Sequence, residues 1–132
     1  MVLKVAMIGT GRIADMKLLP ALSSTDDAVL WSVLSRDKAR AGAVAQQFGA
    51  QAANAAHDNI DEMLADPELD AVIIATPDKL HSEQAIAAAR AGKHVFCEKP
   101  MTTSLAEADA MVEACNAAGV KLGVAFHLRW HA

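Results

Sequence analysis

Several features that would point to particular functions are missing from this chain of 132 residues. It contains no run of five or more lysines and arginines, and its formal net charge is −4. Binding to a phosphate backbone needs a basic face, so we expect no nucleic-acid partner. No apolar stretch reaches the ~18 residues of a membrane span, and the N-terminus lacks the basic region and cleavage site of a signal peptide. We therefore expect a cytoplasmic protein with no membrane partner.

Cysteine is scarce as well. Cys97 and Cys115 lie within apolar patterns, and their separation matches no metal-ligand spacing. We expect both to be buried, reduced thiols, and we expect no metal site. Internal repeats, linkers and low-complexity stretches are also missing, and the length fits one domain. Because 53% of its residues are hydrophobic, that domain can bury a core.

Short apolar runs rich in Val, Ile and Leu alternate with segments of helical period. Alternation of strand and helix is typical of a parallel sheet that is covered by helices on both faces. The expected strands are residues 3–8, 28–34, 71–76, 94–98 and 120–126, with a weak edge strand at 50–54. The sequence therefore predicts an α/β fold with a doubly wound, mostly parallel sheet of about six strands.

Capping residues, glycine and proline mark the ends of the predicted helices. The segment 37–49 carries apolar residues on one face and ends at Gly49, a typical left-handed cap. Two capping boxes, at 59–62 and 104–107, open two further helices. Pro20 is expected to kink or shorten the first helix. The last helix is expected to bury Leu105, Ala108, Met111, Val112 and Cys115.

A glycine-rich loop directly follows the first predicted strand. In the sequence GTGRIA, Gly9, Gly11 and Ala14 match the G-x-G-x-x-G/A fingerprint of dinucleotide binding. Gly9 permits the tight turn, Gly11 lets the backbone approach a pyrophosphate, and Ala14 lets helix and strand pack closely. The anion would then lie on free N–H groups at a helix N-terminus. The candidate cofactor contacts in this loop are Gly9, Thr10, Gly11, Arg12 and Ile13.

The end of the second predicted strand indicates which dinucleotide binds. An NAD site should carry Asp or Glu there to accept hydrogen bonds from the ribose 2′-hydroxyl, but this chain reads VLSRDKAR. Ser35 and Arg36 lie at the tip and Arg40 one turn further, where guanidinium groups can hold a 2′-phosphate. Asp37 is a competing candidate, but it stands where a helix N-cap is needed. We therefore expect NADP(H) in preference to NAD(H).

Three further motifs complete the pattern, namely TPDKLH at 76–81, AGKHVFCEKP at 91–100 and HLRWHA at 127–132. Together with the glycine-rich loop they resemble, over the whole chain, the N-terminal NAD(P)-binding Rossmann domain of the Gfo/Idh/MocA oxidoreductase family. The resemblance implies a dinucleotide-binding domain at 1–126. From 127 to 132 it implies the start of a crossover to a C-terminal substrate domain, which would supply an acid/base pair and is not in this sequence.

The resemblance also implies roles for residues that follow the later strands. Thr76 and Pro77 resemble the turn that passes the nicotinamide ribose. His81 is similar to a histidine near the cofactor, with capping of its helix as an equal alternative. Glu98, Lys99 and Pro100 match the family's E-K-P signature, in which the lysine lies near the nicotinamide and the substrate and the Lys–Pro bond tends to be cis. The candidate cofactor contacts in this part are Ala75, Thr76, Pro77, His81, Glu98 and Lys99.

Lys99 is the catalytic candidate. A cationic donor at the carboxyl end of a strand, where such sheets bind ligands, could polarise a substrate hydroxyl or carbonyl group. An ordinary surface lysine is the alternative. His57, in a polar connection, is expected to be solvated, and His94 at the start of a strand to be structural.

The polar end of the chain resembles the lip of the nicotinamide and substrate cleft. This segment contains His127, Arg129, Trp130 and His131, of which Arg129 and Trp130 are candidate cofactor contacts. Ala132 stands where the family pattern has proline. A disordered tail is the alternative interpretation of these residues.

Two functions follow from these expectations. The first is an oxidoreductase that transfers hydride between NADP(H) and a sugar, polyol or related hydroxyl or carbonyl compound. Without the acid/base pair, this chain would bind cofactor with little or no turnover. The second is a free-standing module that binds NADP(H) without catalysis. Apolar surface left by the missing domain favours association, so we expect a homodimer.

Overall fold

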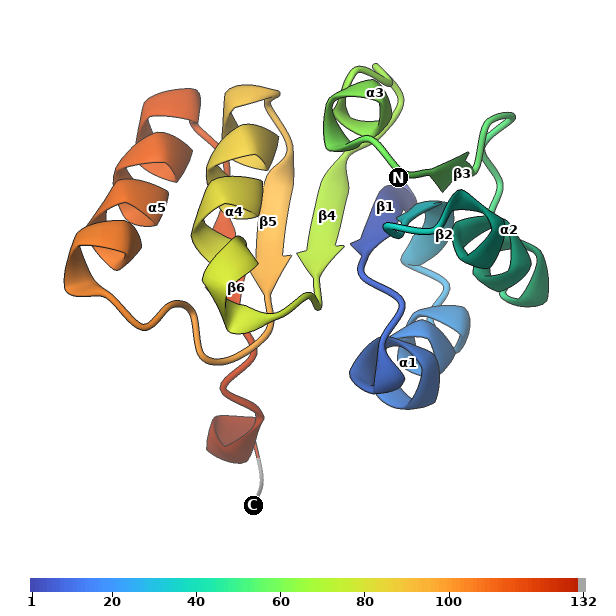
Figure 1. The fold of residues 1–132 in the computed structure, drawn as a ribbon, viewed down its shortest axis with the longest axis horizontal. Helices are drawn as coiled ribbons and strands as arrows, with labels where there is room; N and C mark the ends of the chain where they lie inside the picture. The colour runs from blue at the N-terminus through green and yellow to red at the C-terminus, as the bar shows by residue number, and fades with distance from the viewer. Residues whose placement is uncertain (131–132) are drawn as a thin grey trace.

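Six parallel strands form one sheet in the computed structural model, which describes residues 1–130 (Figure 1). The order across the sheet is β3-β2-β1-β4-β5-β6. The strands are β1 Leu3–Ile8, β2 Ala28–Leu34, β3 Ala56–His57, β4 Ala71–Ile74, β5 His94–Cys97 and β6 Leu122–Val124. The predicted class, a doubly wound α/β sheet of about six strands, is therefore confirmed.

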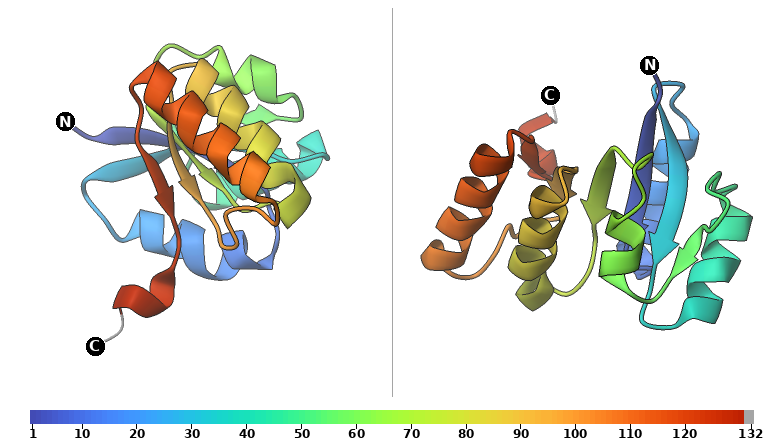
Figure 2. Two further views of the ribbon diagram at one scale, coloured as in Figure 1. Left: turned by 90° about the vertical axis from the view of Figure 1, so that its left-hand side faces the viewer. Right: turned by 90° about the horizontal axis from the view of Figure 1, so that it is seen from above.

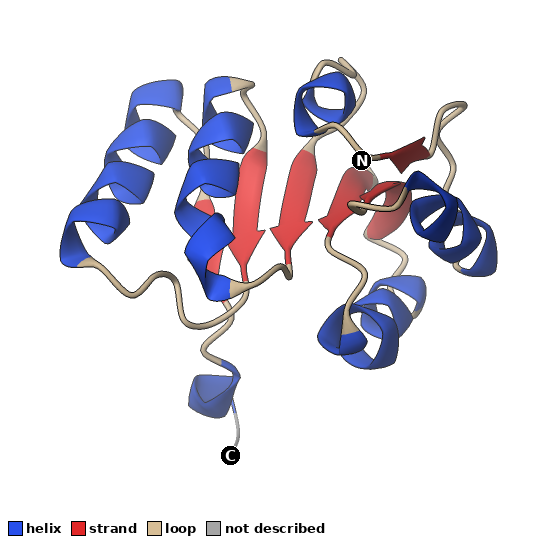
Figure 3. Cartoon of the chain, in the orientation of Figure 1, coloured by secondary structure: helices blue, strands red, loops and turns tan. Residues whose placement is uncertain are grey.

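Helices connect the strands and cover both faces of the sheet (Figures 2 and 3). They are α1 Leu19–Ser23, α2 Lys38–Gln47, α3 Ile60–Leu64, α4 His81–Arg90 and α5 Leu105–Ala118. A π-helical turn, Ala14–Leu18, precedes α1, and short 3-10 helices lie at Asp78–Leu80 and His127–Trp130. Within the described residues, no helix is long and apolar enough to cross a bilayer.

Alternate residues of the strands belong to two separate hydrophobic cores, one on each face of the sheet. In β1, Val5 and Met7 pack with residues of α1 and α2, whereas Ala6 and Ile8 pack with residues of α3, α4 and α5. This division follows from the strand period of two, which sends successive side chains to opposite faces. The last four residues of β1, Val5 to Ile8, are therefore all buried, and the strand lies inside the sheet between β2 and β4.

The position of β1 also creates the place where a ligand can bind. From β1 the chain winds outward to β2 and β3 on one side, and then crosses to β4, β5 and β6 on the other. All strands are parallel, so their carboxyl ends lie at one edge of the sheet. The loops that leave β1 and β4 diverge there and open a crevice, the usual ligand site of doubly wound sheets.

The edge strand differs from its predicted position. We expected it at 50–54, but the ladder with β2 is formed by Ala56 and His57. The backbone of Gln51 and Ala52 does approach β2 and donates to the carbonyls of Leu30 and Trp31 without forming a strand.

His57 is consequently buried rather than solvated, with 6% of its surface exposed. Its Nε2 lies 3.0 Å from the Asn54 carbonyl oxygen. Its other ring nitrogen has no partner among residues 1–130. The polar character of the flanking residues concealed that this short segment joins the sheet.

The last helix buries a narrower stripe than its pattern predicts. Met111 and Cys115 are buried, but Leu105 is 87% and Val112 is 44% exposed. The helix packs mainly against α4 at the end of the sheet, so only one side of it meets the core. Cys97 and Cys115 are free, buried thiols as expected.

The caps of this helix are partly as predicted. Ser104 accepts a hydrogen bond from the Glu107 amide, but the Glu107 carboxylate accepts from the Thr102 hydroxyl instead of returning to the Ser104 backbone. Gly119 ends the helix with φ of +68°, the left-handed conformation that glycine adopts readily.

Pro20 divides the first helical segment, as predicted. A proline inside an α-helix removes one backbone bond and crowds the carbonyl four residues earlier, here that of Met16. The chain instead forms the wider π-helical turn up to Leu18, and α1 then begins with Pro20 in its first turn. The segment after the glycine-rich loop is thus short and irregular.

Candidate functional site

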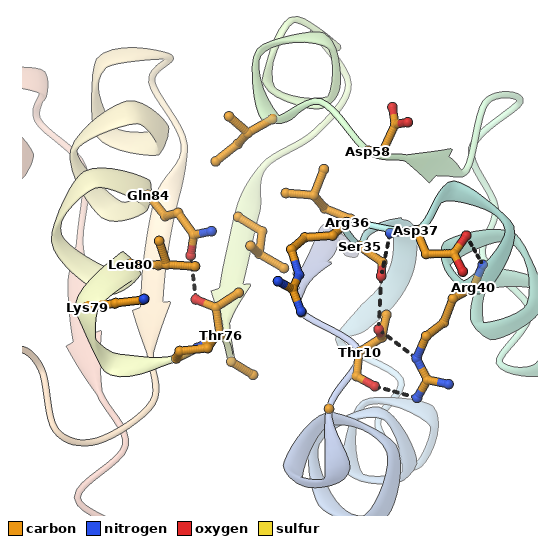
Figure 4. A pocket seen from close by; sticks show the side chains of 17 residues that line it. Thr10, Ser35, Arg36, Asp37, Arg40, Asp58, Thr76, Lys79, Leu80 and Gln84 are labelled. Atoms are coloured by element: carbon orange, nitrogen blue, oxygen red, sulfur yellow. Dashed lines mark hydrogen bonds between the residues drawn. The ribbon is translucent and has the colours of Figure 1, made fainter.

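A cleft of about 740 Å³ lies at the carboxyl edge of the sheet, between the β1–β2 side and the β4 side (Figure 4). Three loops supply most of its wall, namely the glycine-rich loop, the β2–α2 turn and the segment after β4. The lining residues are Ile8, Gly9, Thr10, Gly11, Leu34, Ser35, Arg36, Asp37, Arg40, Asp58, Ile60, Ala75, Thr76, Pro77, Lys79, Leu80 and Gln84.

The two glycines of the loop have different surroundings. Gly9 has φ of +103°, and a Cβ atom there would lie 2.7 Å from the Ala75 carbonyl oxygen. A Cβ atom at Gly11 would meet nothing within 4 Å. Gly9 is therefore needed for close packing of the loop against the end of β4, while Gly11 presents bare backbone to open space. This arrangement fits a dinucleotide, whose pyrophosphate needs such an approach.

A chain of hydrogen bonds joins the loop to the β2–α2 turn (Figure 4). The Arg40 guanidinium donates to the Thr10 hydroxyl at 3.0 Å and to the Thr10 carbonyl at 2.7 Å. The Thr10 hydroxyl donates in turn to the Ser35 hydroxyl oxygen at 3.2 Å, which also accepts from the Asp37 amide at 3.3 Å. The structure thus brings Thr10, Ser35 and Arg40 together, as the sequence predicts for the cofactor site.

The two charged residues at the tip of the turn have different surroundings. The Asp37 carboxylate accepts from the amides of Ala39 and Arg40 and forms the predicted N-cap of α2. Arg36 is exposed and extends into the cleft between Ser35 and Thr76 (Figure 4). Within residues 1–130 its guanidinium has no hydrogen bond or ion pair. The cleft therefore offers an unpaired cation where the sequence pattern calls for a 2′-phosphate.

The β4 side of the cleft contains an interaction that the sequence did not reveal. The Thr76 hydroxyl donates to the side-chain oxygen of Gln84 at 2.5 Å, which joins the turn after β4 to the second turn of α4. Leu80 and Gln84 line the cleft together because residues four apart share a helix face. That spacing was the available signal for Gln84.

His81 is almost fully buried, with 1% of its surface exposed. Its Nε2 lies 2.8 Å from the Thr76 carbonyl oxygen, and its Nδ1 lies 2.8 Å from the Pro100 carbonyl oxygen. Both nitrogens therefore face backbone carbonyls of the protein, and the residue is absent from the cleft wall among the described residues. The ring spans the two loops that follow β4 and β5 instead of presenting a polar atom to a cofactor.

The Glu98–Lys99–Pro100 segment follows β5 at the same edge of the sheet. The Lys99–Pro100 bond is cis, as the resemblance implied. Lys99 is exposed, and its backbone N–H donates to the Glu98 carboxylate at 3.2 Å. Neither Glu98 nor Lys99 belongs to the wall of the cleft as far as the structure describes it.

Four other predicted contacts also lie outside the cleft. The Arg12 guanidinium contacts the Met16 sulfur at 3.2 Å, and Ile13 is 42% exposed. Arg129 stacks on the Phe126 ring, with 5.3 Å to its centroid, and Trp130 is 87% exposed. His131 and Ala132 lie outside the described residues.

The cleft also contains residues that the sequence reading did not select as contacts. These are Asp58, Ile60, Lys79, Leu80 and Gln84, together with the apolar Ile8 and Leu34 at its base. Asp58 follows β3, whose position was predicted wrongly, so its approach to the cleft was not visible in the sequence.

The Cys97 thiol, which precedes the Glu98–Lys99–Pro100 segment, is expected to be unreactive. Burial, followed by the nearby charges of Glu98 and Asp78, raises the pKa of its thiol to about 12. Such a thiol carries almost no reactive thiolate at neutral pH. In the described part of the chain, no group of three or more His, Cys, Asp or Glu side chains could hold a metal ion.

Comparisons with known proteins agree with this geometry. The model of the oxidoreductase family with an NAD-binding Rossmann fold, Gfo/Idh/MocA, matches residues 3–126. The chain is 40% identical over 125 residues to D-xylose 1-dehydrogenase (NADP(+)) 2 of Haloferax volcanii, and this match covers 95% of this chain and 37% of that protein. It is 37% identical over 125 residues to scyllo-inositol 2-dehydrogenase (NAD(+)) of Bacillus subtilis, covering 95% and 36%.

A solved structure has the same fold. The chain superposes with a TM-score of 0.90 and 30% sequence identity on a 3-ketoreductase from Actinomadura kijaniata in complex with TDP-benzene and NADP. That match covers 99% of this chain and 40% of the other. The chain thus spans well under half the length of these relatives. The family model matches most of the chain, and the fold and the cleft between β1 and β4 agree with it. The chain therefore belongs to the Gfo/Idh/MocA oxidoreductase family and contains the NAD-binding Rossmann fold of that family.

Proposed function

We propose that this chain is the NADP(H)-binding part of an oxidoreductase that transfers hydride between the nicotinamide and a sugar, a polyol or a related hydroxyl or carbonyl compound. The glycine-rich loop would hold the pyrophosphate. The β2–α2 turn would hold the adenosine ribose, and the segment after β4 the nicotinamide half. When bound, the nicotinamide supplies the donor or acceptor of hydride. The sugar and polyol class comes from the names of the relatives, D-xylose and scyllo-inositol dehydrogenases.

The unpaired guanidinium of Arg36 is the observation that supports NADP(H). It enters the cleft beside Ser35, and the one carboxylate of this turn, Asp37, is occupied as a helix cap. A 2′-phosphate provides acceptors and negative charge for a guanidinium. Asp58 also lines the cleft, but it follows β3, on the far side of the β2–α2 turn from the glycine-rich loop. One relative is named for NADP(+) and another for NAD(+), so the preference for NADP(H) over NAD(H) rests on Arg36 and not on the relatives.

Lys99 is the residue that we propose to act on the substrate. It is exposed and follows the carboxyl end of β5, the strand next to β4, and the segment after β4 lines the cleft. An ammonium group in this position can donate to a substrate hydroxyl or carbonyl oxygen and stabilise the charge that develops on it. The remaining proton transfer, which typically contributes ~10²- to 10⁴-fold, would need a further acid/base group.

The test is a calorimetric titration of NADPH and NADH into the 132-residue chain and into its Arg36→Asp variant. We expect the wild-type chain to bind NADPH more tightly. Arg36→Asp should weaken NADPH by about ten- to a hundredfold, because it removes charge-assisted hydrogen bonds and adds repulsion, while NADH changes little. Asp58→Asn is the matched control, and the preference should survive it. Equal affinity for both nucleotides in the wild-type chain would contradict the NADP(H) assignment.

The second candidate is a module that binds NADP(H) without turnover. It is favoured by the position of Lys99, which does not line the cleft in the part of the chain that the structure describes. The two functions differ in a stopped-flow measurement of NADPH absorbance after mixing with ketoses and inosose compounds. Oxidation of NADPH that is lost in Lys99→Met indicates the enzyme, whereas tight binding with constant absorbance indicates the module.

A further inference from the structure

The two arginines of the β2–α2 turn are placed for different tasks. Both Arg36 and Arg40 are near the expected 2′-phosphate site in sequence, and both line the cleft. Arg36 has no partner within the described residues, but Arg40 uses Nε and Nη2 to bond Thr10. In Figure 4 Arg40 reaches from α2 toward Thr10, whereas Arg36 reaches into the space between Ser35 and Thr76.

The residue that Arg40 binds is central to the glycine-rich loop. Thr10 stands between Gly9 and Gly11 and is 9% exposed. Its carbonyl is one end of the Thr10–Gly11 peptide, and the N–H of Gly11 is the other. Because a trans peptide is planar, with its C=O and N–H pointing in opposite directions, a carbonyl held toward Arg40 directs the Gly11 N–H away from it. A carbonyl turned into the pyrophosphate site would instead repel the anion.

We propose that Arg40 is a positioning residue, an inference that rests on the proposed function. Its fork holds the Thr10 carbonyl and hydroxyl so that the glycine-rich loop presents N–H groups to the pyrophosphate. The choice between NADP(H) and NAD(H) then depends on Arg36 and not on Arg40. This revises the sequence-based view in which both arginines grip the 2′-phosphate.

The proposal has a direct consequence for affinities. The pyrophosphate is common to both dinucleotides, so a loop that loses its support binds both more weakly by the same factor. The 2′-phosphate is present only in NADP(H), so a lost phosphate ligand weakens that nucleotide alone. The ratio of the two dissociation constants therefore separates positioning from direct recognition.

Calorimetric titrations of NADPH and NADH into Arg40→Lys and Arg36→Lys would test this. Lysine keeps the charge but lacks the planar fork that bonds two oxygens of Thr10. We expect Arg40→Lys to weaken both nucleotides by about tenfold, with their ratio unchanged within about twofold. Arg36→Lys should weaken NADPH binding alone, so that the preference for NADPH over NADH becomes smaller while NADH affinity is unchanged. Loss of NADPH preference in Arg40→Lys, with NADH affinity intact, would overturn the proposal.

A general loss of stability or of positive charge needs separate controls. Arg90→Lys and Arg90→Met alter an exposed arginine in the last turn of α4, outside the cleft, and should leave both affinities unchanged. Thr10→Val removes the hydroxyl that Arg40 bonds but keeps the carbonyl. Its effect and that of Arg40→Lys should combine non-additively, because the two groups act as one unit.

A measurement without nucleotide separates failure of this inference from failure of the proposed function. In the unliganded chain, Arg40→Lys should shift the backbone amide resonance of Gly11, and Arg36→Lys should not. An unchanged Gly11 resonance in Arg40→Lys would contradict the positioning role whether or not the chain binds a dinucleotide. If the wild-type chain binds neither nucleotide although the Gly11 resonance shifts as expected, the proposed function fails and the contact stands.

Discussion

At the scale of single residues, Gly9 and Gly11 should respond differently to the same substitution. Gly9→Ala adds a Cβ atom 2.7 Å from the Ala75 carbonyl oxygen at φ of +103°, so it should destabilise the fold by about 1–3 kcal/mol. Gly11→Ala meets open space in the protein and should leave stability nearly unchanged. It should instead weaken NADPH and NADH, because its methyl group occupies space that the pyrophosphate needs.

Thermal unfolding without ligand and calorimetric titration measure these two effects. The pair controls itself, since both variants add one methyl group to one loop. Equal melting temperatures for Gly9→Ala and Gly11→Ala would show that the loop does not pack on β4 as described. Undiminished nucleotide affinity in a folded Gly11→Ala chain would show that the pyrophosphate lies elsewhere.

At the scale of elements, Asp66 connects the end of α3 to the sheet at the edge opposite the cleft. The Trp31 indole of β2 donates to its carboxylate at 2.8 Å, and this hydrogen bond is the main reason that the pKa of Asp66 is lowered. Buried Lys93 donates to the Asp66 and Leu69 carbonyls at 2.7 and 2.8 Å. These bonds hold the turn between α3 and β4, and therefore the start of β4, in register.

A lowered carboxyl pKa gives this link a definite pH dependence. The stabilisation is present at pH values above the ordinary pKa of aspartate and is lost as the pH falls through the lowered pKa of the folded state. Trp31→Phe should therefore reduce the free energy of unfolding at pH 7 by about 1 kcal/mol, and the difference should narrow in acid. Urea unfolding across this pH range measures it. In an Asp66→Asn background, the loss in free energy of unfolding caused by Trp31→Phe should no longer vary with pH.

At the scale of the whole molecule, apolar side chains remain exposed at the β5–β6 end of the sheet. Phe96 is 40% exposed, because the helices that pack on β5 contact its other face through Val95 and Cys97. Beyond β6, Phe126, Leu128 and Trp130 are 46%, 75% and 87% exposed. Exposed apolar groups of this kind favour association with another surface.

We predict that the 132-residue chain forms a homodimer through this end of the sheet. Sedimentation at micromolar concentration should show a dimer, and the double substitution Leu128→Ser and Trp130→Ser should shift it toward monomer without a change in melting temperature. Both side chains are exposed, so the fold does not depend on them. Replacing Met1 and Val2, which are exposed at the other end of the chain, is the control. A monomer in the unsubstituted chain would contradict the prediction.

The sequence by itself determined the alternation of strands and helices along the chain, the glycine-rich loop, the N-cap at Asp37 and the family. These features depend on local periodicity and on residues close together in the chain, so neighbouring side chains are enough to indicate them. The strand runs near the centre were located well for the same reason, since burial on both faces leaves a continuous apolar run.

Only the tertiary structure showed that, of the two cleft-lining arginines, Arg40 is bonded to Thr10 whereas Arg36 has no partner within residues 1–130. Arg40 and Thr10 are 30 residues apart, and nothing local distinguishes Arg40 from Arg36 as a candidate phosphate ligand. The burial of His81 between Thr76 and Pro100, and the exposure of Leu105, likewise depend on which elements pack together. Such contacts join elements that meet only when the sheet forms, so a sequence pattern indicates the available side chains and the fold assigns their partners.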